Sequence, residues 1–379
     1  MPDIAPPDVS LVIAGEEFRH FVDIELTKSI DTFSTAQFTA PFEADRKEFR
    51  RIFKPFGYNS VNVLVDKKVR LTGEMLSPLP RIDALTKAVA VQCYSLPAVM
   101  NDCCPPGTAY PLEFTGQTLL TIAQTVASKF GVTARFDETV SVDEELHAFQ
   151  KKKMKRGPRG GRGKRGNKFA RCALEPGDNA DEFLVKLAQQ IGLVRSDNEI
   201  GELVFRDSDA TLGNPVAHFE QGKQPLVVIT PEFRPQEYYS EITAFTPATT
   251  RRKGSKYTLQ NPFTRGKNIV RPHCFKLDSL LSAGDAPAAC WAKLGRMFGN
   301  AASWTIDNIA TWRDANGDIW QPNTTVLVTA PDAMIYKTYE LLVRDVVLRQ
   351  AADQYTASLR VVMPGAFSGA VPDALPWDE

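Results

Sequence analysis

The sequence predicts a mainly β protein with an α+β region in its middle, and two patterns of apolar residues predict this class. Apolar and polar residues alternate in short stretches of the first hundred residues and again after Pro225, as they do in half-buried β-strands. Between these regions, apolar residues recur twice with the spacing of helices. With 379 residues, 43% hydrophobic and 24% charged, the chain is expected to fold into several domains, and wholesale disorder is excluded.

The first hundred residues show the β pattern clearly. The segment from Ala36 to Phe42 has alternating apolar positions, which predicts a strand with one buried face. Further short strands are predicted over 61–65, 69–75 and 89–91, with turn-forming residues between them. Many short strands at this spacing are typical of a small barrel or sandwich, so 1–100 is expected to be a β domain.

Two helix–strand units follow. Apolar residues lie on one helical face from Leu119 to Phe130 and again from Ala180 to Ile191, and each pattern ends at a glycine, a common helix stop. Asn179 and Glu182 resemble a capping box in front of the second helix. Because each helix is followed by an apolar strand pattern, 101–212 is expected to be a central α+β domain.

The β pattern returns in the C-terminal half, interrupted by one helix. A helix is predicted at about 287–302, and Asn316-Gly317 predicts a hairpin turn. Strands are predicted over 226–229, 238–245, 257–259, 325–329, 339–348 and 355–363. We therefore expect a second β domain from 213–262 and 322–366, an α+β insert over 263–321 and an extended tail over 367–379.

The charges of the chain are separated rather than mixed. Lysine and arginine total 45, as do aspartate and glutamate, so the formal net charge is zero. Residues 151–171 nevertheless carry a charge of +11 with no acidic residue, which leaves −11 on the rest of the chain. The eleven basic residues are Lys151, Lys152, Lys153, Lys155, Arg156, Arg159, Arg162, Lys164, Arg165, Lys168 and Arg171.

This basic stretch is expected to be a long loop, inserted over 150–170 between the two helix–strand units. It contains six glycines and prolines and has no apolar periodicity, so it lacks the means to form a packed element. Its functional interpretation is an electrostatic tether to phosphates or to an acidic protein surface. The alternative is a solvated surface insertion without a partner.

Several classes of protein find no support in the sequence. No apolar run approaches the roughly 18 residues of a membrane span, and the N-terminus lacks the features of a signal peptide. No nucleophile, phosphate-loop or zinc motif is present, so we expect no enzyme, no cofactor and no metal. Residues 314–318 resemble the start of a calcium loop, but Ile319 and Thr325 stand at its sixth and twelfth positions, where such a loop has glycine and glutamate, which favours a hairpin. The six cysteines are expected to be free thiols, and the sequence leaves open whether any of them forms a disulfide: Cys93, Cys103, Cys104, Cys172, Cys274 and Cys290.

A series of segments, in chain order, resembles one known family. The matching segments are 11–18, 28–33, 71–73, 89–103, 114–119, 175–204, 317–323, 341–346 and 362–364. They resemble the central baseplate hub proteins of contractile-tailed phages, that is, the Mu-like hubs and the late control gene D family. Cys93-Tyr94 stands where that family usually has Gly-Arg, and the 150–170 insert lies outside the family pattern.

The resemblance implies two antiparallel β-barrels of the tail-tube type per chain, joined by small α+β domains and assembled into a trimeric ring. Three chains would then present six similar barrels, which lets a trimer link the six-fold tail tube to the three-fold central spike. The implied role is structural: a homotrimer in the virion tail baseplate, assembled in the host bacterial cytoplasm, that contacts the spike, the tube and other baseplate proteins. DNA would pass through its axial channel without specific binding.

The charge separation gives two further expectations. We expect part of the acidic body to line the channel, where it would repel DNA phosphates, and the basic insert to face outward toward an acidic neighbour. A hub of a type VI secretion or pyocin-like system shares the implied architecture; a fused C-terminal spike would favour it, and the sequence ends at Glu379 without one. A nucleic-acid-binding protein that acts through the basic loop is the second alternative.

Overall fold

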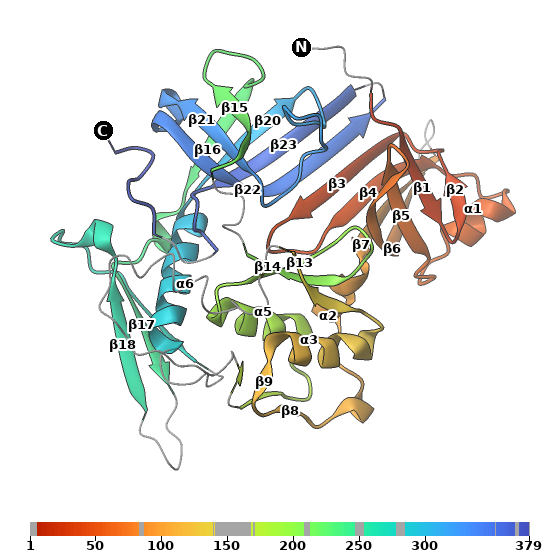
Figure 1. Ribbon diagram of the computed structural model, residues 1–379. Helices are drawn as coiled ribbons and strands as arrows, with labels where there is room; N and C mark the ends of the chain where they lie inside the picture. Colours follow the sequence, from red (N-terminus) through yellow and green to blue (C-terminus); the bar gives the residue numbers. More distant parts are fainter. Residues whose placement is uncertain are drawn as a thin grey trace.

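A long, mostly antiparallel sheet crosses the upper part of the molecule, and most of the helices lie below it (Figure 1). The computed structural model describes residues 6–82, 87–138, 140, 168–169, 171–207, 213–246, 254–277, 285–352, 354–367 and 371–378. The mainly β class with α+β parts, predicted from the alternating patterns, is confirmed. Within the described residues no helix is both long and apolar enough to span a bilayer.

The N-terminal half of the long sheet has the order β3-β4-β7-β6-β5-β1-β2. Its strands are β1 (Val9–Ile13), β2 (Glu16–Phe18), β3 (Asp23–Ser29), β4 (Thr35–Pro41), β5 (Ser60–Val65), β6 (Lys68–Ile82) and β7 (Lys87–Ser95). A short helix, α1 (Lys47–Ile52), adds Phe49 and Ile52 to the core behind these strands. In β4 every second side chain is buried, as the alternation of the sequence predicts.

The C-terminal half continues the sheet in the order β22-β23-β20-β16, with β21 beside β22 and β15 parallel to β21. The strands are β15 (Pro215–Glu220), β16 (Val228–Phe233), β20 (Ala302–Ile309), β21 (Thr325–Ala330), β22 (Ile335–Ala351) and β23 (Gln354–Val362). The predicted hairpin turn is present, because Arg313 bridges Ile319 and Gly317 has a φ of 86°, in the left-handed region that favours glycine.

The two halves meet at one seam, where β22 pairs with β3. The register runs from Asp345 opposite Ser29 to Ala351 opposite Asp23. The first part of β22 pairs with β21 and its last part with β3, so this 17-residue strand belongs to both halves. Two tail-tube-like barrels were expected; over the described strands, the pairing forms one 13-stranded sheet whose main path ends at β16 and β2, and no closed barrel is detected.

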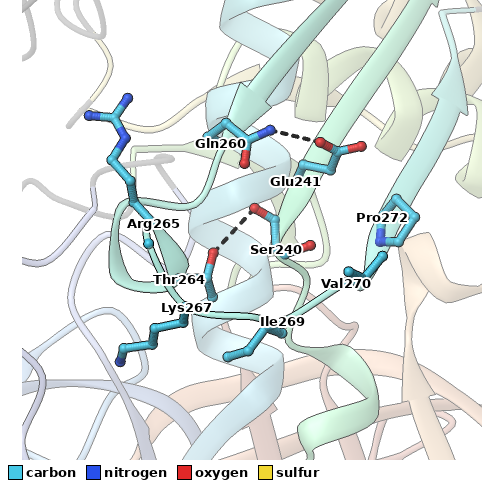
Figure 2. Close-up of a pocket in the computed structure, with 10 residues that line it drawn as sticks. Ser240, Glu241, Gln260, Thr264, Arg265, Lys267, Ile269, Val270 and Pro272 are labelled. Carbon is cyan, nitrogen blue, oxygen red and sulfur yellow. Dashed lines mark hydrogen bonds between the residues drawn. The ribbon is translucent and has the colours of Figure 1, made fainter.

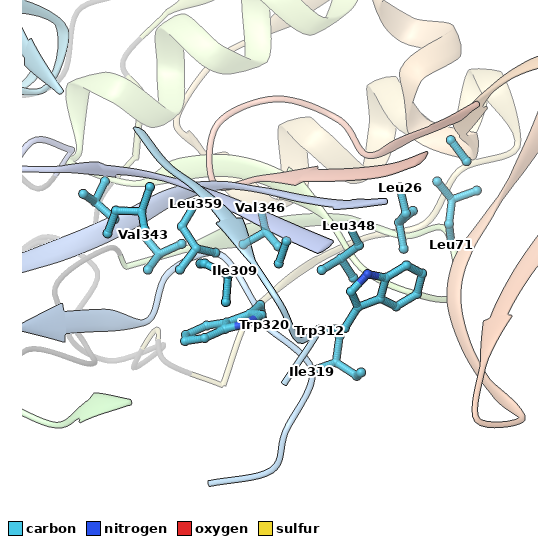
Figure 3. Close-up of a cluster of buried hydrophobic side chains, with 14 of the residues drawn as sticks. Leu26, Leu71, Ile309, Trp312, Ile319, Trp320, Val343, Val346, Leu348 and Leu359 are labelled. Carbon is cyan, nitrogen blue, oxygen red and sulfur yellow. The ribbon is translucent and has the colours of Figure 1, made fainter. Parts of the chain in front are cut away.

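One apolar core lies behind both halves of the sheet. Trp312 and Trp320 are almost fully buried, and Figure 3 shows them beside strand residues such as Val346 and Leu348. The Trp312 indole N–H donates to carbonyl oxygens of β22 and β23 at 3.1 and 3.0 Å. The same core extends to Leu26 of β3, so packing as well as pairing joins the two halves.

The central domain has its own core and contains both predicted helices. Thr118 caps α3 (Leu119–Ala127), and the Asn179 side chain accepts a hydrogen bond from the Glu182 backbone N–H at the start of α5 (Ala180–Gln190). The remaining elements are α2 (Val99–Asp102), β8 (Leu112–Phe114), β9 (Gln117–Thr118), β10 (Ala134–Phe136), β11 (Lys168–Phe169), β12 (Cys172–Leu174), β13 (Val194–Asp197) and β14 (Leu203–Arg206).

A second small α+β unit consists of α6 (Asp285–Ala301) packed on a three-stranded sheet of order β18-β17-β19. The strands are β17 (Glu241–Thr246), β18 (Ser255–Gln260) and β19 (Pro272–Lys276). The sequence grouped β17 and β18 with the second β domain and β20 with the insert, whereas here β20 joins the long sheet. Short 3-10 helices complete the chain: Leu96–Ala98, Gly107–Ala109, Ser128–Phe130, Pro235–Glu237, Pro262–Thr264 and Pro331–Ala333. The domain limits remain a prediction.

The C-terminal segment 371–378 packs on the body of the protein. Leu375 is buried, and the Trp377 ring lies 5.5 Å from the ring of Phe233 on β16. The Tyr339 hydroxyl donates to the Ala374 carbonyl oxygen at 2.9 Å. These contacts hold the segment against β16 and β22.

Candidate assembly surfaces

The face of the long sheet turned away from the core spans both halves and is lined by short polar side chains. The strand registers place one set of threonines and glutamines on this face, none of them buried: Thr27, Thr35, Gln37, Thr39, Gln92, Thr230, Thr305 and Thr356. We call it the outer face. The N-terminal and the C-terminal strands both contribute to this surface.

Two ion pairs on the outer face join residues of different strands. Glu25 of β3 lies directly opposite Arg349 of β22 at the seam, with 2.7 Å between the carboxylate and Nε. The carboxylate of Glu232 on β16 lies 2.8 Å from Nη2 of Arg360 on β23. The guanidinium of Arg234 is the main cause that lowers the pKa of Glu232, and Arg360 adds to it. Arg349 and Arg360 therefore each have a carboxylate partner, whereas Arg81 of β6 is a further exposed arginine that the registers place on this face.

Below the outer face, buried charges join the long sheet to the central domain. Lys28 of β3 donates to the carboxylate of Glu199 at 2.7 Å, and the Ser34 backbone N–H and hydroxyl donate to Asp197 at 3.1 and 3.0 Å. Burial lowers the pKa of Lys28 and raises the pKa of Asp197. These contacts fix the N-terminal strands on the central domain.

A second buried pair lies within the central domain. Arg195 of β13 and Asp181 of α5 form a salt bridge, and both side chains are almost completely buried. The guanidinium carbon of Arg195 also lies 3.8 Å from the centre of the Phe33 ring, which precedes β4. Burial raises the pKa of Asp181 and lowers the pKa of Arg195. The pair therefore orders α5, β13 and the long sheet together.

A pocket lies beside β17, where the chain passes from Thr264 to Pro272 (Figure 2). Its cavity is about 410 Å³. The polar groups in it contact one another: Gln260 donates to the Glu241 carboxylate at 2.7 Å, and the Thr264 hydroxyl donates to the Ser240 carbonyl oxygen at 3.3 Å. The described lining residues contain no pair of nucleophile and base, so this arrangement offers no recognisable reaction chemistry.

The cysteines are free thiols, as predicted. Burial raises the pKa of Cys93 to about 12 and the pKa of Cys172 and Cys290 to about 11, which keeps these thiols protonated and unreactive. Cys103, Cys104 and Cys274 are exposed. Over the part of the chain that the structure describes, no group of three histidine, cysteine or acidic side chains is placed to hold a metal ion.

Most of the predicted basic site lies outside the described residues. This holds for Lys151, Lys152, Lys153, Lys155, Arg156, Arg159, Arg162, Lys164 and Arg165. Lys168 is exposed on β11, and Arg171 is exposed with its guanidinium 3.8 Å from the carboxylate of Glu113. The expectation that the whole stretch is a loop is wrong at its end, because Phe169 is fully buried and β11 pairs with β9.

The paired and buried charges escaped the sequence analysis. Glu25 and Arg349 are separated by 324 positions, and Lys28 and Glu199 by 171. The sequence around a charged strand residue does not indicate which distant residue will form an ion pair with it. Only the register of β3 with β22 could have suggested the first pair.

Solved structures with a similar fold connect this architecture to phage tails. The 43 kDa tail protein of prophage MuSo2 from Shewanella oneidensis matches with a TM-score of 0.73 and 18% identity, over 95% of this chain and 99% of that one. The tail protein from Neisseria meningitidis MC58 matches with a TM-score of 0.71 and 16% identity, over 96% and 98% of the two chains. The chain has the phage tail-protein fold.

The tail-protein fold confirms the resemblance predicted from the sequence at the level of fold. It extends to the E. coli c3393 protein, a type VI secretion component described as similar to the T4 tail proteins gp27 and gp5. That match has a TM-score of 0.50 and 11% identity, over 93% of this chain and 76% of the other. No family model and no curated protein sequence matches the chain.

Proposed function

We propose that this protein is a trimeric baseplate hub that links a six-fold tail tube to a three-fold central spike. One observation carries the proposal: the pairing of β3 with β22 places two β halves side by side in one chain. Three chains arranged around an axis present six such halves, which reconciles the two symmetries. The similarity in fold to phage tail proteins supports the same role.

The proposed role is structural and carries no enzymatic activity. The protein would be assembled in the bacterial cytoplasm and would reside in the tail baseplate of the virion. Its partners would be its own copies, the central spike, the tail tube and other baseplate proteins. DNA would pass along the axis of the ring without specific binding, and the outer face of the long sheet is the surface we assign to the channel wall.

The mass of the purified protein tests the proposal. Light scattering coupled to size-exclusion chromatography, or native mass spectrometry, is expected to give the mass of three chains of 42.0 kDa each. Measuring the mass at two protein concentrations distinguishes a stable ring from weak association, because weak association depends on concentration. A monomer at both concentrations would contradict the hub.

The hub of a type VI secretion or pyocin-like system is the second candidate. The similarity in fold to the E. coli secretion component favours it, at a lower score than the phage tail proteins. Recovery of the protein in purified, DNA-containing tailed particles would support the phage hub. Recovery only in DNA-free contractile particles would support the alternative.

The basic insert is proposed to bind an acidic neighbour in the baseplate. Its exit strand β11 pairs with β9, which lies at the bottom of Figure 1, on the side away from the long sheet. The exposed Lys168 and Arg171 continue the positive charge at this place. An insert that leaves the protein here would not line the surface assigned to the channel.

Neutralising the insert is expected to weaken baseplate assembly and to leave the trimer intact. The variant replaces every lysine and arginine within 151–165 with serine, which removes the charge and keeps the chain length. A matched control replaces each arginine there with lysine and retains the charge. We expect the yield of assembled particles to fall about tenfold for the first variant only, because charge attraction guides such contacts. Equal yields would contradict an assembly role for the insert.

A further inference from the structure

Two arginines on the outer face of the long sheet, Arg349 and Arg360, lie where free arginines would hinder the passage of DNA. Arg349 of β22 has a side chain 50% exposed, and Arg360 of β23 has one 27% exposed. An exposed guanidinium binds phosphate with two parallel hydrogen bonds, more tightly than other side chains do. On a ring of three chains, each such residue would be presented three times.

Each of these arginines is held by a carboxylate on a neighbouring part of the same sheet. Glu25 faces Arg349 across the β3–β22 seam, and the Arg349 Nη1 also lies 3.4 Å from the Ser358 hydroxyl. Glu232 holds Arg360, whose Nε and Nη2 lie 3.3 and 3.2 Å from the Ser303 hydroxyl. Two of the three nitrogens of each guanidinium are thus engaged within the protein.

The rest of the outer face is consistent with a surface that does not hold DNA. Several threonine and glutamine side chains lie on it, and these offer only weak, neutral hydrogen bonds to phosphate. The strand registers also place Asp23 and Asp307 on this face, and their carboxylates repel phosphate. Exposed ion pairs of this kind contribute little to stability. Stability therefore does not explain why these charges are aligned.

We propose that Glu25 and Glu232 are masking residues, which neutralise Arg349 and Arg360 so that double-stranded DNA slides along the outer face instead of binding to it. This inference rests on the proposed function, because it takes DNA as the molecule that moves along the face. It also refines the expectation of an acidic channel: the wall is made non-adhesive by paired charges and neutral polar groups as well as by net negative charge.

The test compares DNA binding by the full-length wild type and a Glu25→Gln/Glu232→Gln variant. Binding of a labelled 30-base-pair duplex is followed by fluorescence anisotropy at several salt concentrations. The variant is expected to bind about tenfold more tightly at low salt, with a steeper salt dependence, because freed arginines displace counterions from phosphates. The basic insert is the same in both proteins and cancels in the comparison.

Two further variants make the result specific. Glu16→Gln/Glu43→Gln changes the net charge equally but breaks pairs with Arg51 and Arg46, off the outer face, and is expected to leave the affinity unchanged. Glu232 also contacts Arg234, so adding Arg234→Gln/Arg349→Gln/Arg360→Gln to the first variant is expected to abolish its gain. An unchanged affinity of the first variant, an equal gain in the charge control or a gain that survives the added substitutions would overturn the masking role.

The mass of each sample separates this inference from the proposed function. A trimer without a gain in affinity refutes the masking role and leaves the hub standing. A monomer with a gain supports the masking role and contradicts the hub. Circular dichroism of each variant verifies that the fold is retained, as expected for surface substitutions of this size.

Discussion

Replacing Asp181 with alanine is expected to lower the free energy of unfolding by about 3–5 kcal/mol, because it leaves the buried guanidinium of Arg195 without its counter-charge. Both side chains are almost completely buried between α5 and β13. The Phe33 ring on which Arg195 stacks belongs to the long sheet, so the loss should also loosen the contact between sheet and central domain. Urea denaturation followed by tryptophan fluorescence measures the change.

Two controls separate the buried charge from a general effect of mutation in α5. Glu182→Ala removes the neighbouring acid, which is exposed and pairs only distantly with Lys186, and is expected to cost less than about 1 kcal/mol. The double variant Asp181→Leu/Arg195→Met removes both charges and keeps most of the volume, so it should be more stable than Asp181→Ala. A double variant as unstable as the single one would show that the ionic pair is not the cause.

Replacing Gly73 with alanine is expected to destabilise the protein by about 3 kcal/mol or to prevent the pairing of β6 with β7. A methyl group at this position would lie 1.8 Å from the Tyr94 carbonyl oxygen and 2.7 Å from its carbon, and both atoms belong to the backbone. The strands must therefore separate, and β6 and β7 form the centre of the N-terminal half. The midpoint of thermal or urea unfolding reports the loss.

Gly107→Ala is the matched control for this substitution. Gly107 lies in a short 3-10 helix, and nothing lies within 4 Å of a methyl group placed there. It is expected to change stability by less than about 0.5 kcal/mol. A Gly73→Ala protein with wild-type stability would mean that β6 and β7 do not approach as closely as the structure shows.

The sequence predicted the features that depend on residues close together in the chain, and it did not predict those that depend on distant residues. The helices α3 and α5, the cap at Asn179 and the turn at Gly317 follow from residues within one or two turns of chain, and the sequence predicted each of them. The sequence did not predict that β22 continues past β21 and pairs with β3, which joins the two halves in one sheet. Alternation of apolar residues reports which face of a strand is buried but not which strand lies beside it.

The sequence by itself determined the class of the protein, its central helices and the separation of +11 and −11 within a neutral chain. These properties depend on composition and on local periodicity, which a single chain displays directly. The tertiary structure alone decided the seam between β3 and β22, the buried pair of Asp181 and Arg195, and the alignment of Glu25 with Arg349. Such contacts join residues far apart in the chain, and their partners are fixed only when strand register and packing bring the backbones together.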